Sequence, residues 1–219
     1  MHNAKTYLKF KRCLDFLFSL IGLIVLSPIL ILTAILIKLE SKGPVIFKQE
    51  RLGKNGENFK IYKFRSMCVG AEKAGGVYSA KGDSRVTKVG RFIRATSIDE
   101  LPQFINILKG DMSIIGPRPT LTYHPWPIDK YTSEQRRRFE VRPGVTGLAQ
   151  INGRKDIQWD KRIEYDVQYV DNISINLDLK IFMKTIAKVL TMQDNVNIGS
   201  TVRSNTINVE KNKKSDLNN

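Results

Sequence analysis

The most distinct pattern in the chain is an apolar run over residues 16–37, which contains no charged side chain. Roughly 20 consecutive apolar residues can cross the hydrocarbon core of a bilayer as a helix. A secretory signal fits poorly, because no small-residue cleavage site follows and Lys38, Glu40 and Lys42 come instead. A helix buried in a globular core is a further alternative, although such a helix normally carries polar positions on one face. The run therefore predicts a membrane-embedded helix.

The middle of this run carries Ser27 and Pro28. Proline lacks a backbone donor and clashes with the preceding turn, so the helix should kink there, and the Ser27 hydroxyl can satisfy a carbonyl that the break leaves free. Positive residues stay cytoplasmic, and they flank the run on both sides, as Lys5, Lys9, Lys11, Arg12, Lys38 and Lys42. This favours a re-entrant helix over an ordinary crossing. Asp15 is then expected near the membrane interface, where a charge costs less.

The body of the chain mixes strand and helix patterns. Residues 45–53 and 58–67 alternate apolar and basic positions and predict two strands joined by a turn. Residues 69–84 are rich in glycine and small polar residues and predict a long loop. Apolar residues then recur at helical spacing from Leu101 to Leu108, and Gly110 ends that helix. Ser97 and Glu100 match a capping box at its start, which Pro102 fits imperfectly.

The C-terminal half predicts a short basic helix within residues 124–140 and longer helices at residues 160–170 and 177–192. The last is amphipathic, with one face of lysines and another of apolar residues: Lys180, Lys184 and Lys188 against Leu179, Phe182, Ile186 and Val189. Such a helix packs on a core or lies on an anionic membrane surface.

These patterns predict an α+β fold with three segments. Residues 1–42 form the re-entrant membrane helix and its flanks, and residues 43–192 form a single compact cytoplasmic catalytic domain with amphipathic interfacial helices. Residues 193–219 form a polar tail without hydrophobic periodicity, which is expected to be disordered.

The composition narrows the class of partner. Lysine and arginine number 36 against 21 acidic residues, a net charge of +15, which implies polyanionic partners such as nucleic acid, anionic lipid or phosphorylated substrates. No helix-turn-helix, RNP or zinc pattern is present, so we expect no nucleic-acid partner. The two cysteines, Cys13 and Cys68, form no spaced cluster, which argues against a disulfide framework or a zinc site.

The adjacent carboxylates Asp99 and Glu100 are the strongest candidates for chemistry. An ionised aspartate can act as a nucleophile toward phosphorus, and a glutamate can hold Mg²⁺ that bridges phosphate oxygens. Acidic residues in the first turn of a helix are more often plain capping residues. Their neighbours favour the functional reading: Arg94 precedes them, and Arg118 follows between two prolines that fix its backbone for phosphate binding. Phosphoryl transfer relies on such positioning and charge neutralisation.

Several ordered motifs make the chain resemble the bacterial sugar transferases, in particular the small monotopic phosphoglycosyl transferases. The resemblance covers residues 10–190 and lies in KRCLDFLFSLIGLIVLSPILI, GPVIFKQERLG, FKIYKFRSM, TSIDELPQFINILKGDMSIIGPRP and RPGVTGLAQINGR. The loop at residues 69–84 resembles nothing in the family with certainty.

The resemblance implies a two-step transfer. Asp99 matches the nucleophile that attacks the sugar-bearing phosphate of a UDP-sugar with release of UMP, and Glu100 matches the residue tied to Mg²⁺. Polyprenyl phosphate, such as undecaprenyl phosphate, then takes the sugar-phosphate. Ser27 and Pro28 match the break of the re-entrant helix, which lies in the bacterial inner membrane with the catalytic domain facing the cytoplasm. Such a transfer is the first membrane step in the assembly of a surface glycan, as in capsule or exopolysaccharide.

Six basic residues are assigned to substrate phosphates: Arg94 and Arg118 by their match to family residues, and Lys63, Arg65, Arg142 and Arg154 by motif position and charge. The alternative function is a catalytically inactive membrane scaffold of a polysaccharide assembly system. The donor sugar stays open, and a homo-oligomer is compatible with the sequence.

Overall fold

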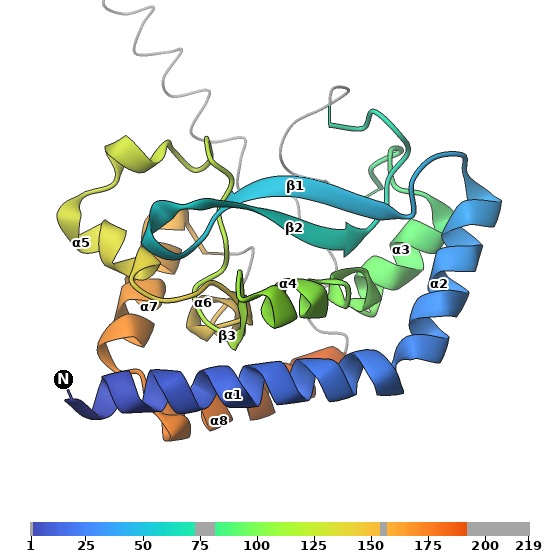
Figure 1. Ribbon diagram of the computed structural model, residues 1–219. Coiled ribbons are helices and arrows are strands. Elements are labelled where there is room, and N and C mark those ends of the chain that lie inside the picture. The colour runs from blue at the N-terminus through green and yellow to red at the C-terminus, as the bar shows by residue number, and fades with distance from the viewer. Residues whose placement is uncertain (1, 73–81, 154–156, 192–219) are drawn as a thin grey trace, which may run out of the picture.

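The computed structural model describes residues 2–72, 82–153 and 157–191. A long β-hairpin lies across one side, short helices and strands form the middle, and helix α1 (His2–Val25) runs along the opposite side with α8 (Ile175–Leu190) next to it (Figure 1). This arrangement confirms the mixed helix and sheet composition of a compact α+β fold. The predicted tail at residues 193–219 lies outside the described residues.

The predicted strand pair is confirmed as strands β1 (Ile46–Leu52) and β2 (Asn58–Phe64). They pair antiparallel, with Ile46 opposite Phe64 and Leu52 opposite Asn58. The turn η1 (Lys54–Gly56) allows the reversal because Asn55 and Gly56 take the left-handed backbone conformation that asparagine and glycine tolerate.

The middle of the molecule is built from short elements. These are α3 (Lys88–Ala95), η2 (Ile98–Glu100), α4 (Gln103–Lys109), β3 (Ser113–Ile115), β4 (Gly144–Thr146) and α6 (Leu148–Ile151). Strands β3 and β4 pair in parallel. Gly110 ends α4 in the left-handed conformation, as predicted.

The capping box predicted at Ser97 and Glu100 is wrong. Ser97 is itself left-handed, at φ 59° and ψ 14°, and its side chain caps nothing. The two carboxylates occupy a separate 3₁₀ turn, and α4 begins after Pro102, whose fixed φ suits the residue before a helix.

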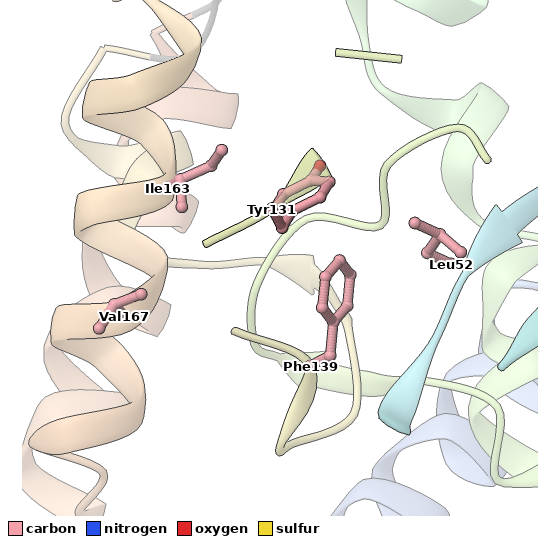
Figure 2. Close-up of a cluster of buried hydrophobic side chains, with 5 residues drawn as sticks. All are labelled: Leu52, Tyr131, Phe139, Ile163 and Val167. Carbon is pink, nitrogen blue, oxygen red and sulfur yellow. The ribbon is translucent and has the colours of Figure 1, made fainter. Parts of the chain in front are cut away.

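The far end of the hairpin is held by an aromatic and aliphatic core. Helices α5 (Ser133–Arg136) and α7 (Trp159–Asp171) flank it, with the turns η3 (Ile128–Lys130) and η4 (Arg137–Phe139). Figure 2 shows Leu52 from the hairpin facing Tyr131 and Phe139, with Ile163 and Val167 of α7 on the other side. Tyr131 meets Phe139 edge to face, with ring centroids 5.3 Å apart, which adds to the apolar burial.

The apolar run breaks where the sequence predicted. Helix α1 ends at Val25 and α2 (Ser27–Glu40) begins after a single intervening residue, Leu26. The two helices are bent by 62° at this break. Pro28 cannot donate to the carbonyl of Ile24, and the Ser27 hydroxyl donates to that carbonyl at 2.7 Å instead. The hydroxyl therefore replaces the hydrogen bond that the proline removes.

Within the described residues, neither helix alone has the length and apolar character to cross a membrane, whereas the bent pair satisfies both criteria together. Large apolar side chains along the pair face outward: Phe16, Leu17, Phe18, Leu20, Ile21, Ile24, Val25, Ile29, Ile31, Leu32, Ile35, Leu36 and Leu39. Helix α2 points away from the axis of α1, and its end leads to the start of β1 (Figure 1).

Helix α8 packs on the core with a different face from the one expected. Ile181 and Asp178 are buried, together with part of Leu177, while Leu179, Phe182, Ile186 and Val189 are 39–59% exposed. The apolar row of α8, for which the sequence left a core or a membrane surface open, therefore lies on the surface of the molecule.

Helix α1 is joined to the body by a buried polar cluster. Asp15 accepts hydrogen bonds from the Ser113 hydroxyl at 2.7 Å and from the Ile114 backbone at 3.1 Å. Lys11 pairs with Asp178 of α8 at 2.9 Å, and Tyr7 also donates to Asp178. Asp15 is only 4% exposed, and these donors compensate its buried charge; its place near a membrane interface stays a prediction.

Candidate functional site

The candidate site is centred on the turn η2, between α3 and α4. This turn lies against β2 and α3, so that Asp99 and Glu100 come close to basic side chains from three other segments. The left-handed Ser97 reverses the chain directly before the turn. Asp99 and Glu100, which share one short sequence motif, end in different electrostatic surroundings.

Glu100 is fully engaged by cations. Its Oε1 accepts from Lys63 Nζ at 2.7 Å and from Arg118 Nη2 at 2.8 Å. Burial alone would raise the pKa of Glu100, but the charges and hydrogen bonds of Arg118 and Lys63 hold this pKa well below its ordinary value. Glu100 is therefore ionised at any physiological pH.

Asp99 is surrounded by the same charges without a direct bond to them. In the described parts of the chain, no donor is hydrogen-bonded to its carboxylate. Burial raises the pKa of Asp99 to about 6, opposed by Lys63, Arg94 and Arg118 and reinforced by the neighbouring Glu100. The side chain is ionised near neutral pH and keeps its oxygen lone pairs available for reaction.

Arg94 reaches the site from the last turn of α3, whose start is capped by the Thr87 side chain. Its Nε donates to Ser66 Oγ at 2.8 Å. Burial lowers the pKa of Arg94, while Asp99 and Asp83 act to raise it, so the guanidinium lies within electrostatic range of the reactive carboxylate.

Arg118 is held by the backbone around it, in the segment at residues 116–120. The carbonyl of Arg118 accepts from Arg138 Nη2 at 2.8 Å, and the carbonyl of Thr120 accepts from the Leu52 backbone at 2.9 Å. Arg138 is in turn fixed by Asp166 of α7 at 2.6 Å, and both are 2% exposed. This scaffold presents the Arg118 side chain, itself partly open to solvent, beside Glu100.

Arg51 is a site residue that the sequence analysis missed. Its Nη1 donates to the Pro119 carbonyl at 3.3 Å. Burial lowers the pKa of Arg51 to about 10, as does Arg118, while Glu100 raises it. In the sequence Arg51 is one of several basic residues in an alternating strand, and only the pairing of the hairpin with residues 119–121 brings it to the site.

The other predicted basic residues lie elsewhere. Arg65 donates to carbonyls at the end of α2, to Ser41 at 2.7 Å and Lys42 at 2.9 Å, and thereby holds the returning helix. Arg142 donates to the Gly110 carbonyl at 2.7 Å, away from the carboxylates. Arg154 lies outside the described residues. The phosphate-binding role of these three stays a prediction.

The residues present could hold a magnesium ion only together with substrate phosphates and water. No group of three or more His, Cys, Asp or Glu side chains gathers within residues 2–72, 82–153 and 157–191. Mg²⁺ is commonly held by one or two carboxylates together with substrate phosphates and water. Glu100 meets that requirement, since both of its described hydrogen bonds go to Oε1, whereas a metal cage made of protein alone is not available among those residues.

Comparisons with known proteins identify the family to which this chain is similar. A profile described as bacterial sugar transferase matches residues 6–192. A putative undecaprenyl-phosphate N-acetylgalactosaminyl 1-phosphate transferase of Bacillus subtilis is 58% identical over 162 residues, which are 74% of this chain and 81% of that protein. The uncharacterized sugar transferase EpsL of the same organism is 46% identical over 84% of this chain and 88% of its own length.

A longer relative is the UDP-N-acetylgalactosamine-undecaprenyl-phosphate N-acetylgalactosaminephosphotransferase of Aeromonas hydrophila. It is 47% identical over 188 residues, which are 84% of this chain. The match spans only 44% of that relative, so this chain corresponds to less than half of its length.

Proposed function

The chain belongs to the bacterial sugar transferase family, and from this premise we propose that it transfers a sugar-1-phosphate from a UDP-sugar to polyprenyl phosphate. The family profile and the relatives confirm the resemblance found in the sequence motifs. The printed functions of the undecaprenyl-phosphate relatives support the two substrates, and the surplus of positive charge at the site supports a diphosphate donor. Relatives named for UDP-sugars and undecaprenyl phosphate also support a membrane location.

One observation carries the proposal: Asp99 is ionisable near neutral pH and has cations around it, yet no described donor is bonded to its oxygens. A carboxylate with a merely structural role would be expected to accept hydrogen bonds, as Glu100 does from Lys63 and Arg118. Asp99, a carboxylate without a described hydrogen bond, suits a nucleophile. The neighbouring Glu100, which is bonded by two cations, suits an electrostatic support.

The reaction then has two balanced steps. An Asp99 oxygen bonds to the sugar-bearing phosphorus as the bond from that phosphorus to the UMP oxygen breaks, and UMP leaves. An oxygen of polyprenyl phosphate next bonds to the same phosphorus, which releases the Asp99 carboxylate and gives a polyprenyl diphosphate sugar. In this proposal Arg94 and Arg118 neutralise the phosphate oxygens, and Lys63 keeps Glu100 anionic and fixed.

A bound Mg²⁺ would supply further neutralisation of the phosphate charge, with Glu100 as its protein ligand. Removing the metal with excess chelator should abolish UMP release, because the Asp99 carboxylate would then face uncompensated phosphate charge. Restoring Mg²⁺ should restore the rate. Full activity in excess chelator would exclude a metal role for Glu100.

The α1–α2 pair is proposed to enter and leave the cytoplasmic leaflet. The 62° bend, the outward apolar side chains and the Arg65 contacts that hold the end of α2 at the catalytic body support this topology. Single cysteines at positions 5 and 42, with Cys13 and Cys68 replaced by serine, should both resist an impermeant thiol reagent in intact cells. Labelling of one position alone would indicate a crossing helix. Pro28→Leu should shift the labelling toward that pattern.

The decisive experiment supplies a UDP-sugar without acceptor. UMP should appear in an amount comparable to the enzyme, and the intact protein should gain the mass of one sugar-phosphate on the peptide that contains Asp99. Full turnover with undecaprenyl phosphate should follow ping-pong kinetics. A panel of UDP-sugars identifies the donor.

Asp99→Asn should remove the adduct and the turnover while keeping the fold. Asp129→Asn is a matched control, because Asp129 lies in the exposed 3₁₀ turn η3 and should leave both unchanged. Sequential kinetics without UMP release in the absence of acceptor would exclude the covalent step. A chain that binds its partners but releases no UMP from any donor would instead be the inactive scaffold.

A further inference from the structure

A small, open cleft lies beside Ser97, the residue before η2, and is bounded by β4, α6 and the C-terminal half of α8. Its walls come from segments far apart in the sequence: Ser97 before the carboxylates, Thr146 of β4, Gln150 and Ile151 of α6, and Thr185, Lys188 and Val189 of α8. Ser97 lies two residues before Asp99. The reaction steps above leave this cleft without an occupant.

Gln150 is the unusual residue in this cleft. It is 5% exposed, and both its Oε1 and its Nε2 are buried without a hydrogen-bond partner in the described parts of the chain. Leaving both groups of a buried amide without a hydrogen-bond partner is unfavourable for folding. A ligand that offers both a donor and an acceptor would recover that cost, and it would do so whichever way round the amide is placed.

The neighbouring hydroxyls need the same kind of ligand. Thr185 Oγ1 donates to the Ile181 carbonyl at 2.8 Å, so its single proton is used. The 2.7 Å contact between the Thr146 and Thr185 hydroxyls must then be a bond donated by Thr146. Thr146 therefore presents lone pairs to the cleft and no proton.

This set of groups is selective in its chemistry. A phosphate at neutral pH mainly accepts hydrogen bonds, so it could satisfy the amide nitrogen of Gln150 but would face the oxygens of Gln150 and Thr146 without a proton to give. Sugar hydroxyl and acetamido groups can donate and accept. Neutral amides and hydroxyls beside small apolar surfaces are the surroundings in which sugar hydroxyl groups are recognised.

We propose that this cleft binds the sugar of the nucleotide-sugar donor, with Gln150 and Thr146 as residues that determine sugar specificity. The assignment rests on the proposed function, because it needs the phosphorus at Asp99 to carry the sugar toward Ser97. Ile151 and Val189 then contact the carbon face of the ring. Lining residues outside the charged site explain how one reaction chemistry can serve different sugars.

The test compares the binding of a UDP-sugar with that of UDP. Titrations use the full-length Asp99→Asn protein with Mg²⁺, so that no donor is consumed, and take the sugar of highest affinity among UDP-glucose, UDP-galactose and UDP-N-acetylgalactosamine. Gln150→Leu should reduce the preference for the UDP-sugar over UDP by about tenfold, the value of one or two hydrogen bonds. Affinity for UDP itself should change by less than about twofold. Thr146→Val should act in the same direction with a smaller loss.

Gln168→Leu is the matched control, since Gln168 is exposed on α7 and lies outside the cleft. Gln150→Glu keeps the size and the acceptor oxygens of the side chain. A reduced preference for the UDP-sugar in this variant therefore reports a lost contact from the amide nitrogen and not a disturbed fold. Melting temperatures near that of the parent protein are required of each variant compared.

Three results would overturn the sugar assignment. They are an unchanged preference in Gln150→Leu and Thr146→Val, an equal loss of UDP affinity, or a parent protein that binds no UDP-sugar better than UDP. A variant that changes only the KM for polyprenyl phosphate would assign the cleft to the acceptor, whose chain could follow the exposed apolar row of α8. Failure of the proposed function is distinct, since UDP-sugar preference without UMP release leaves the sugar site standing.

Discussion

The α1–α8 interface and the η2 turn each bring two carboxylates against cations, and they differ in what those carboxylates bond. In the interface, Asp178 accepts from Tyr7 and Tyr169 and pairs with Lys11, while Asp15 accepts from Ser113 and Ile114. In the turn, Oε1 of Glu100 is bonded by two cations, whereas no described donor bonds Asp99.

This difference in hydrogen bonding distinguishes a cluster that stabilises the fold from one that can react. Buried charges are tolerated where every lone pair and proton is satisfied, and such clusters hold elements together. A carboxylate left unbonded among cations keeps its reactivity at some cost to folding. The first cluster fastens α1 to the body, and the second leaves the oxygens of Asp99 available for the nucleophilic role proposed above.

The largest expected effect is on stability. Asp178→Ala removes the acceptor that Lys11, Tyr7 and Tyr169 share and leaves buried Lys11 with only the 3.8 Å pair to Asp15, so we expect a loss of about 3–5 kcal/mol in the free energy of unfolding. Asp99→Ala should cause no loss, because the raised pKa makes ionised Asp99 less stable in the folded than in the unfolded chain at pH 7. Denaturant unfolding in detergent micelles measures both. Equal losses would contradict the comparison.

Glu100→Gln should lower kcat by about 10²-fold, because Lys63 and Arg118 lose the anion that positions them and the metal loses a ligand. KM for the donor should change less than kcat. Glu134→Gln, at an exposed carboxylate on α5, is the control and should leave the kinetics unchanged. A rise in KM with unchanged kcat would show that Glu100 serves substrate binding alone.

The pH dependence should report Asp99. With a pKa of about 6, raised by burial, the reactive carboxylate is ionised above that value and protonated below it. Single-turnover UMP release should therefore fall by about tenfold from pH 7 to pH 5. The free energy of unfolding should change in the opposite direction to the rate. It should rise as pH falls toward the ordinary aspartate pKa, because the folded chain takes up this proton before the unfolded chain does. A midpoint near pH 4 would contradict the raised pKa.

The smallest expected effect is that of Arg51→Lys. The charge is kept, but the contact with the Pro119 carbonyl is lost, so KM for the UDP-sugar should rise about threefold to tenfold. Arg51→Met should raise it further. Lys48→Met on the same strand is the control, and a similar rise there would make the effect one of general surface charge.

Local patterns predicted local features well. The break at Ser27–Pro28, the hairpin of β1 and β2 and the end of α4 at Gly110 all follow from backbone rules that act within a few residues. The same kind of rule failed at Ser97, where the capping box gave way to a left-handed residue, because packing of η2 against β2 and α3 decides that turn.

The sequence by itself determined which residues could carry the chemistry, but not the surroundings of each one. Only the family resemblance distinguishes Asp99 from Glu100 in the sequence, and their surroundings diverge when Lys63 and Arg118, 37 and 18 residues away from Glu100, bond to Glu100 alone. Arg65 and Arg51 likewise differ through contacts with α2 and with residues 119–121. Tertiary structure decided these roles because burial and charge pairing depend on neighbours distant in the chain, whereas helix breaks and tight turns depend on neighbours within it.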